Sequence, residues 1–358
     1  MKETFIKKIR VKKLQADLFM PFTISSGSHA RLENILFEVE LQSGIKGFGE
    51  AAVASHITGE TLGLTFSNLK KIGVAFEGKD IADYFKLFVF AERALDKNRC
   101  ALATVEMAIL DALTKSLNIP LWKFYGNKCE KIKSDITLVI GGEKNNYSFV
   151  RKMAKRGFNL FKIKVGVDFD EDINRVVSVS KIACGAGIYL DANCAYDANT
   201  ALKFIKTLEK HKVVPLVFEQ PTAKDDFKAL KFLSGKLKMP VCADESVSSV
   251  EDAFRIIKNG YANAINIKLM KFGLMSAREI YNLARAKNVK LMMGEMLESS
   301  LSSLCAAHFA GGLGGFDFMD LDTPFFIKDK IMNSEGIIKK SGIYEVNKVK
   351  KGIGVKPY

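Results

Sequence analysis

Eight short apolar runs in the second part of the chain constrain its fold more than any other feature. They begin after about residue 130, recur at roughly 20- to 30-residue spacing, and alternate with segments that have the apolar period of helices. The runs occupy residues 136–140, 160–165, 187–190, 214–218, 240–242, 264–267, 290–293 and 316–321. This alternation predicts parallel βα units, and eight such units close into a (β/α)₈ barrel.

The first 128 residues have a different pattern. Apolar residues predict strands before residue 50, the clearest at 35–41, and helices from 60 to 128. We therefore expect an α+β domain at residues 1–128, the barrel at residues 129–328, and a lysine-rich tail at residues 329–358 that returns to the first domain. The length of 358 residues suits one barrel, typically of ~250 residues, with one smaller domain.

Composition and charge argue against several other classes of protein. The six cysteines form no C-x-x-C pair, which gives no zinc cluster or redox motif and suits a reducing compartment. No apolar stretch reaches the ~20 residues of a membrane helix, and the N-terminus lacks the apolar run of a secretory signal, so we expect a cytoplasmic protein. The net charge of +14 comes from dispersed lysines without an aromatic-interleaved stripe, which favours a solvated surface over a nucleic-acid site.

Carboxylates follow three successive apolar runs where the predicted strands end. Asp191 ends the third strand, Glu219 the fourth and Asp244 the fifth, so all three meet at the active face of the barrel. Three oxygen ligands that leave positions open suit a hard cation, and Mg²⁺ fits best. Asn193 and Glu245 lie beside these ligands in the sequence and are expected to support them.

Lysines end two further predicted strands. Lys162 and Lys164 end the second strand, where alternation places both side chains on one face, and Lys268 ends the sixth. Because Lys164 and Lys268 lie four strands apart, they would face a metal-held substrate from opposite sides. Burial beside a cation would lower the pKa of such lysines and let them accept a proton. The metal would stabilise the enolate-like charge that forms when a proton leaves the carbon next to a carboxylate.

Each of these residues alone also has a structural interpretation. A single carboxylate at a strand end usually caps a helix or faces solvent, and one K-x-K pair in a lysine-rich chain means little. The order of the motifs favours catalysis, because K-x-K, D-x-N, E-Q-P, D-E-S and a final lysine each fall at their own strand end.

This series of motifs resembles the enolase superfamily, in its muconate-lactonizing subgroup. The matching stretches are FKIKVG at 161–166, DAN at 191–193, FEQP at 218–221, ADES at 243–246 and NIKLMKFGL at 266–274. The resemblance covers almost the whole chain. It implies a capping domain with a substrate-specificity loop, then the barrel, then a C-terminal return to the cap. In the last predicted strand, FMDLDTP at 318–324 resembles the D-x-D motif of the dipeptide epimerases.

The resemblance implies a role for each charged residue that matches. Asp191, Glu219 and Asp244 would bind Mg²⁺. Lys164 and Lys268 would remove and return the α-proton of the C-terminal residue of an L,L-dipeptide, one on each face, and so invert that carbon.

The remaining matched residues would bind the substrate. Lys162 would neutralise the substrate carboxylate and hold down the pKa of Lys164. Asp320 and Asp322 would hold the α-ammonium of the N-terminal residue, and two inward carboxylates are physically suited to a cation. The alternative is a pair of aspartates that only orders the loop. The other predicted substrate contacts are Gly27, Met296 and Thr137.

One departure from the family bears on specificity. Dipeptide epimerases that act on Ala-Glu carry an arginine in the loop after the first strand, where this chain has Gly27, with His29 and Arg31 nearby but out of register. Apolar residues flank this loop and follow the D-x-D motif: Met20, Phe22, Ile24, Phe325 and Phe326. They either leave room for a hydrophobic substrate side chain or belong to the core. We predict a preference for hydrophobic or aromatic dipeptides.

Two alternatives stay open at this level. Another member of the subgroup, such as an o-succinylbenzoate synthase or a muconate cycloisomerase, would share the metal and the lysines but need no ammonium site. A non-catalytic barrel that binds nucleic acid would use the charge of +14 instead. The family resemblance also implies a homo-oligomer.

Overall fold

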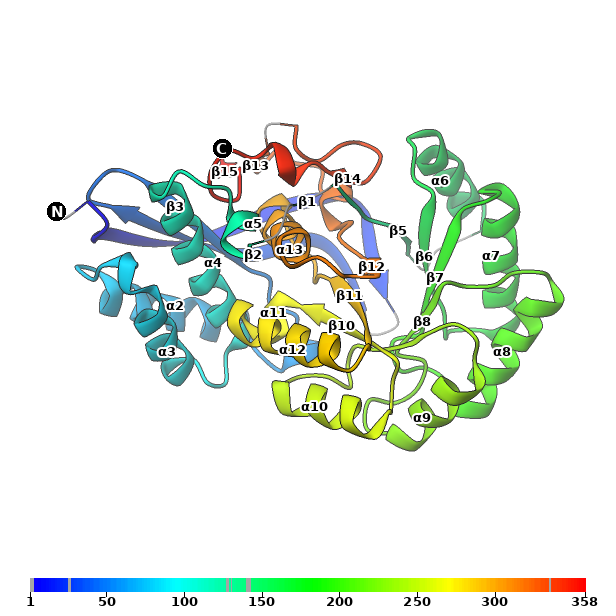
Figure 1. Cartoon of the computed structure of the whole chain (residues 1–358). Coiled ribbons are helices and arrows are strands. Elements are labelled where there is room, and N and C mark those ends of the chain that lie inside the picture. The colour runs from blue at the N-terminus through cyan, green and yellow to red at the C-terminus, as the bar shows by residue number, and fades with distance from the viewer. Residues whose placement is uncertain (1–2, 25–26, 127–128, 130, 140–142, 335) are drawn as a thin grey trace.

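One curled sheet of eight parallel strands forms the larger part of the structure, a computed structural model (Figure 1). The strands are β5 (Ile136–Leu138), β6 (Leu160–Lys164), β7 (Gly187–Asp191), β8 (Val217–Glu219), β9 (Val241–Ala243), β10 (Ala264–Lys268), β11 (Lys290–Gly294) and β12 (Phe318–Met319). They pair in sequence order, as βα units require. All eight predicted strands are confirmed. The structure describes the chain except residues 1–2, 25–26, 127–128, 130, 140–142 and 335, and only the backbone of 22–24, 27–28, 56 and 143–145.

Each barrel strand except the last leads into an α-helix. The helices are α6 (Glu143–Lys155), α7 (Phe169–Ile182), α8 (Ala198–Lys210), α9 (Phe227–Lys236), α10 (Val250–Asn259), α11 (Leu269–Phe272), α12 (Leu274–Ala286) and α13 (Ser300–Leu313). After β12 the described chain forms the 3₁₀ helix η2 (Thr323–Phe325) and then pairs with the first strand of the chain, where Lys328 N–H donates to Asp17 O at 2.8 Å. That pairing takes the place of an eighth barrel helix.

The ends of the curled sheet meet through β5 and β12. Asp135 N–H donates to Met319 O at 3.3 Å, and Leu321 N–H donates to Ser134 Oγ at 2.7 Å. These contacts bring the chain before β5 next to the chain after β12, although the two are far apart in sequence. The barrel mouth is therefore a closed ring of strand ends.

The capping domain packs a three-stranded antiparallel sheet against helices. Its elements are β1 (Ile6–Ile24), β2 (Gly27–Leu41), β3 (Lys46–Ala51), α1 (Ser55–Thr58), α2 (Leu62–Phe76), η1 (Ile81–Asp83), α3 (Tyr84–Ala94), α4 (Arg99–Ser116) and α5 (Leu121–Phe124). Helix α4 lies very close to β3. A Cβ at Gly47 or Gly49 would stand 2.2 or 2.0 Å from a carbonyl oxygen of α4, so only glycine fits at either position.

The C-terminal segment contacts the capping domain (Figure 1). Ile353 N–H donates to the buried carboxylate of Asp111 on α4 at 2.8 Å. The short elements of the C-terminal segment are β13 (Met332–Asn333), β14 (Ile343–Tyr344), η3 (Val346–Lys348) and β15 (Lys356–Pro357). Strand β14 pairs with β4 (Ile132–Lys133). No helix among the described residues is long and apolar enough to cross a membrane.

A buried glutamate of the cap joins it to the barrel. Glu106 on α4 accepts the N–H of Leu274, the first residue of α12, and that of Met275 at 3.3 Å. Burial raises the pKa of Glu106 to about 8 in spite of these hydrogen bonds. The helix N-terminus supplies donors that a buried acceptor needs, so this contact fixes the cap on the barrel.

Candidate active site

Alternation along the strands places polar residues one layer above an apolar barrel floor. The floor consists of Tyr189, Val217, Cys242, Ala264, Met292 and Phe318, one from each strand from β7 to β12. Two residues further along those strands come Asp191, Glu219, Asp244, Asn266, Gly294 and Asp320. Because side chains two apart on a strand share a face, this second layer also points inward. The same strands thus build the floor and the site above it.

The first cluster of carboxylates consists of Asp191, Glu219 and Asp244 on three adjacent strands. Asp191 and Glu219 are register partners on β7 and β8, and Asp244 directly follows β9. Their exposed fractions are 0%, 0% and 1%. Lys164 Nζ lies 2.6 Å from Asp191 Oδ2, and Lys268 Nζ lies 2.7 Å from Asp244 Oδ2. The structure therefore brings the predicted metal ligands and both predicted catalytic lysines together.

Lysines keep two of these three carboxylates strongly acidic. Burial alone would raise the pKa of Asp191 and of Asp244, but the lysines that contact them outweigh burial and lower both pKa values well below the usual range. Burial, followed by repulsion from Asp191, raises the pKa of Glu219 to about 8. Burial, with repulsion from Asp191 and Asp244, thus leaves Glu219 the least acidic of the three carboxylates.

Lys162 lies between this cluster and the end of β12. Its Nζ is 2.6 Å from Asp320 Oδ2, 2.7 Å from Glu219 Oε2 and 3.0 Å from Asp191 Oδ2. Burial lowers the pKa of Lys162, but these carboxylates outweigh burial and raise it. The pKa of Lys268 is raised for the same reason, mainly by Asp244. The protein's own groups do not supply the lowered pKa expected for Lys268.

Three polar residues that sequence reasoning missed support the first cluster. Lys271 on α11 donates to both Oδ1 and the backbone carbonyl of Asp244, each at 2.7 Å. Asn266 Nδ2 donates to Glu219 Oε1 at 2.7 Å. Gln220 Oε1 accepts the N–H of Asp244 at 2.9 Å. The sequence signal was present, because Lys271 lies three residues after Lys268 and Gln220 belongs to the E-Q-P motif.

The predicted supporting residues Asn193 and Glu245 contact each other. Asn193 Nδ2 donates to Glu245 Oε1 at 3.1 Å, and Asn193 N–H donates to Asp191 Oδ1 at 3.0 Å. Asn193 adopts a positive φ of 41°, a conformation that asparagine tolerates better than most residues. The loop after β7 therefore holds Asp191 through its own backbone.

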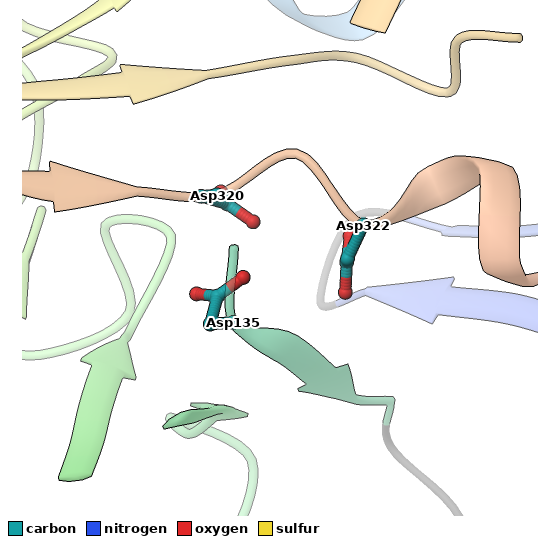
Figure 2. Close-up of side chains that lie close together, drawn as sticks. All are labelled: Asp135, Asp320 and Asp322. Atoms are coloured by element: carbon teal, nitrogen blue, oxygen red, sulfur yellow. The ribbon is translucent and has the colours of Figure 1, made fainter. Parts of the chain in front are cut away.

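A second cluster of carboxylates consists of Asp135, Asp320 and Asp322 (Figure 2). Each offers an oxygen within 4.8 Å of the others, the one such group of acidic, His or Cys side chains in the described part of the chain. Thr137 N–H donates to Asp322, and Lys162 is the lysine that contacts Asp320. Burial, followed by repulsion from Asp320, raises the pKa of Asp135 well above its usual value and that of Asp322 to about 7.

A cavity of about 270 Å³ lies between the cap and the barrel mouth, beside lysines that contact the first cluster and two carboxylates of the second. Lys162, Lys164 and Lys268 line it on the barrel side, together with Asp320 and Asp322. The barrel also supplies Thr137, Asn193 and Thr323. The cap and the segment after β11 supply the rest of the lining: His29, Arg31, Glu33, Asn34, Ala52, Val53, Ala54, Ser55, Ile57, Leu62, Glu295, Met296 and Leu297. A cavity with opposed lysines, a carboxylate pair and an apolar wall suits a small, charged and partly apolar molecule.

Two of the three remaining predicted contacts lie at this cavity. Thr137 and Met296 both line it. Gly27 begins β2, but its surroundings lie outside the described residues, as do residues 25–26 of the predicted loop. His29, expected in that loop, belongs to β2 and pairs with Phe22.

Aromatic residues near the D-x-D motif belong to the core rather than to the lining of this cavity. Phe326 is 2% exposed and stacks on Phe149 at 6.1 Å, and Phe325 packs edge-on against Phe158 at 5.2 Å. The apolar wall comes instead from the cap, chiefly Val53, Ile57 and Leu62, and from Leu297. Arg31 does line the cavity, but its Nε lies 2.9 Å from Asp17 Oδ1.

Family descriptions match both parts of the chain. The description "Mandelate racemase / muconate lactonizing enzyme, N-terminal domain" matches residues 7–126, and "Enolase C-terminal domain-like" matches residues 147–358. The two matches together cover most of the 358 residues.

Known proteins resemble the chain over nearly its whole length. A hydrophobic dipeptide epimerase of Citrifermentans bemidjiense is 38% identical over 96% of this chain and 95% of that protein. An aromatic dipeptide epimerase of Herpetosiphon aurantiacus is 35% identical over 91% of this chain and 92% of that protein. The structure of a dipeptide epimerase of Enterococcus faecalis, complexed with Mg and L-Leu-L-Tyr, has a TM-score of 0.93 and 27% identity and covers 98% of this chain and 99% of that one.

Proposed function

The chain belongs to the mandelate racemase and muconate lactonizing enzyme family of the enolase superfamily, and we propose from its site that it is a dipeptide epimerase. The reaction is inversion of the α-carbon of the C-terminal residue of an L,L-dipeptide. One observation carries the proposal: the opposed lysines Lys164 and Lys268 share a cavity with the carboxylates Asp320 and Asp322. A substrate with both a carboxylate and a free ammonium would bind its carboxylate near the lysines and its ammonium near Asp320 and Asp322.

We assign Asp191, Glu219 and Asp244 as the residues that would hold Mg²⁺. Three buried carboxylate oxygens on adjacent strands fit a hard cation, and their mutual repulsion is what such a cation would relieve. Relatives complexed with Mg support this choice of metal. The second cluster has the closer oxygen spacing, so it is the rival metal site. When bound, Mg²⁺ supplies positive charge that stabilises the substrate carboxylate as the α-proton leaves.

The chain's own residues then move the proton. One of Lys164 and Lys268 accepts the α-proton on its Nζ, and the other donates a proton to the opposite face of the same carbon, so no atom is gained or lost. A lysine must be neutral to accept a proton. Asp244 favours the charged form of Lys268, and a cation on Asp244 would weaken that preference. Lys162 would pair with the substrate carboxylate.

The second cluster distinguishes this reaction from others in the subgroup. With a substrate that lacks an ammonium, Asp320 and Asp322 would remain buried, and Lys162 would be the lysine that contacts Asp320. Because Lys162 also contacts Asp191 and Glu219, and burying carboxylates without enough positive charge is costly, a cationic group on the substrate accounts for the pair. This observation favours a dipeptide over o-succinylbenzoate synthase or cycloisomerase chemistry.

The preferred side chains follow from the rest of the cavity. Its apolar wall suits hydrophobic or aromatic residues, and Arg31, a cation at the mouth, already contacts Asp17. Relatives named for hydrophobic and aromatic dipeptides support the same preference.

We further propose a cytoplasmic homo-oligomer that acts on small molecules rather than on nucleic acid. Buried thiols at Cys100, Cys242 and Cys305 suit a reducing compartment. Gel filtration with light scattering would give the oligomeric state.

Incubation of L,L-dipeptides with the protein and Mg²⁺, followed by chiral separation, tests the proposal. We expect L,D-dipeptides to form, fastest from hydrophobic pairs such as those with Leu or Phe. If no dipeptide converts, and o-succinylbenzoate forms from its precursor, the subgroup alternative is correct instead.

A further inference from the structure

Residues 295–299, which we call the pocket wall, connect β11 to α13 and form one side of the cavity. Glu295, Met296 and Leu297 line the cavity. Glu295 Oε1 accepts the N–H of Thr323 at 2.7 Å, and Thr323 directly follows Asp322. The pocket wall therefore lies beside the carboxylates that would hold the substrate ammonium.

Glu50 on β3 holds the pocket wall from the capping domain. It is 0% exposed, and its Oε1 accepts the N–H of Ser299 at 2.9 Å while its Oε2 accepts the Ser299 hydroxyl at 2.5 Å. Ser302 N–H, in the first turn of α13, also points to Oε2 at 3.4 Å. One carboxylate of the cap thus accepts hydrogen bonds from the last residue of the pocket wall and from the first turn of α13.

Asn34 on β2 extends this contact to the cavity itself. Its Nδ2 donates to Glu50 Oε1 at 2.6 Å and to Leu297 O at 2.9 Å, and its side chain lines the cavity. Asn34 and Glu50 are cross-strand neighbours, because β2 pairs with β3 with Ile35 opposite Ala51 and Leu36 opposite Glu50. The two residues act as one unit that connects the cap sheet to Leu297.

We propose that Glu50, acting with Asn34, is a positioning residue that fixes the pocket wall and thereby sets how the N-terminal residue of the dipeptide binds. The inference rests on the proposed function, because the N-terminal residue of the dipeptide lies beside the pocket wall only if its ammonium binds at Asp320 and Asp322. Glu50 touches no substrate atom in this account. Its effect passes through Leu297 and Ser299, whose positions it holds.

Asp111 offers a matched control. It is a cap carboxylate with 0% exposure that accepts the N–H of Phe48 at 3.0 Å and of Ile353 at 2.8 Å. Those contacts stay within the cap and the C-terminal segment. Asp111→Asn therefore changes a buried carboxylate of the same domain without touching the pocket wall.

The experiment compares Glu50→Gln, Asn34→Ala and Asp111→Asn with the wild-type protein on dipeptides that differ only in the N-terminal residue or only in the C-terminal residue. For Glu50→Gln we expect KM to rise about tenfold with little change in kcat, the effect of weakening one buried hydrogen bond. The ratio of kcat/KM between N-terminal Leu and N-terminal Ala should change, and the ratio for the C-terminal residue should not. Amide exchange of residues 295–303 should become faster.

The outcomes separate this inference from the function on which it rests. A lower melting temperature with unchanged N-terminal selectivity in both Glu50→Gln and Asn34→Ala would make the contact merely structural and overturn the inference. An equal change of selectivity in Asp111→Asn would also overturn it. If the wild-type protein converts no dipeptide at all, the proposed function fails, and the inference fails with it.

Discussion

The two carboxylate clusters at the barrel mouth differ in the cations that face them. Asp191 and Asp244 of the first cluster each contact two lysines within 3.0 Å, and their pKa values are lowered. In the second cluster Lys162 contacts Asp320, and the pKa values of Asp135 and Asp322 are raised. Burial is nearly complete in both clusters, so nearby positive charge accounts for the difference.

We propose that this difference gives each cluster a different task. Carboxylates kept ionised by lysines are ready ligands for a permanent divalent cation, which can replace the lysines as partners. A cluster whose one contacting lysine, Lys162, is shared with Asp191 and Glu219 suits a further cation that arrives with the substrate and leaves with the product. Asp135 sharpens this contrast, because its Oδ2 has no hydrogen-bond partner in the described part of the protein.

The largest expected effect is the loss of epimerisation on changing a lysine that contacts the first cluster. Lys268→Ala should lower epimerisation by about 10³-fold or more, because the proton on one face of the substrate loses its donor or acceptor. Exchange of the α-proton through Lys164 should survive from one enantiomer, measured by NMR in deuterated water. Equal exchange from both enantiomers would contradict the two-face arrangement.

The next effect distinguishes the two clusters as metal sites. Asp244→Asn should weaken Mg²⁺ binding by more than about 100-fold in calorimetry, whereas Asp322→Asn should leave it within about twofold. The reverse result would place the metal at Asp135, Asp320 and Asp322, the cluster with the closer oxygen spacing.

Removing charge from the second cluster should weaken binding of the substrate and leave binding of the metal unchanged. Asp320→Asn should lower kcat/KM for a dipeptide by roughly 30-fold, or about 2 kcal/mol, because the ammonium loses a buried partner. An analogue with a methyl group in place of the ammonium serves as the control. If the variant and the wild type still differ as much with that analogue, Asp320 is not an ammonium ligand.

A smaller effect is expected at Lys271, which holds Asp244 in place. Lys271→Met should raise the Mg²⁺ dissociation constant about tenfold, as loss of a supporting contact does at other metal sites. Lys271→Arg, which keeps the charge, should recover part of the affinity. Unchanged Mg²⁺ affinity in Lys271→Met would show that Asp244 needs no such support.

The last expected effect lies outside both clusters and is on stability, with no expected effect on the metal or the substrate. Burial lowers the pKa of His308 to about 4, and the ring bridges Trp122 N–H and Ile353 O. Between pH 6.5 and 4 the His308 imidazole binds a proton in the unfolded chain but not in the native protein. The free energy of unfolding should therefore fall by about 3 kcal/mol as the pH drops through this window. Chemical denaturation at several pH values measures this fall, and a His308→Gln variant with the same pH slope would contradict it.

The sequence predicts what depends on local spacing. Runs of apolar residues locate the eight strands, and acidic residues at or just after the ends of these runs locate Asp191, Glu219, Asp244 and Asp320 at the barrel mouth. Both follow from the two-residue period of a strand, which any segment carries by itself.

Contacts between distant segments leave no such local signal. Glu50 reaches Ser299 across 249 residues, and Asp135 meets Asp320 because the barrel closes. The chain after β12 pairs with β1 instead of forming a helix, which the run at 316–321 does not reveal. The apolar cavity wall likewise comes from the cap, whereas Phe325 and Phe326 looked like candidates because they follow the D-x-D motif.

A mass-spectrometric measurement in deuterated water with Mg²⁺ and pooled L,L-dipeptides tests most directly whether Lys164 and Lys268 invert the C-terminal residue of a dipeptide. We expect one deuterium at the α-carbon of the C-terminal residue, in both the remaining L,L-dipeptide and the L,D-product, and most of it in hydrophobic pairs. Deuterium at the N-terminal α-carbon, or none in any pool, would contradict the assignment of the two lysines and the second cluster to a dipeptide.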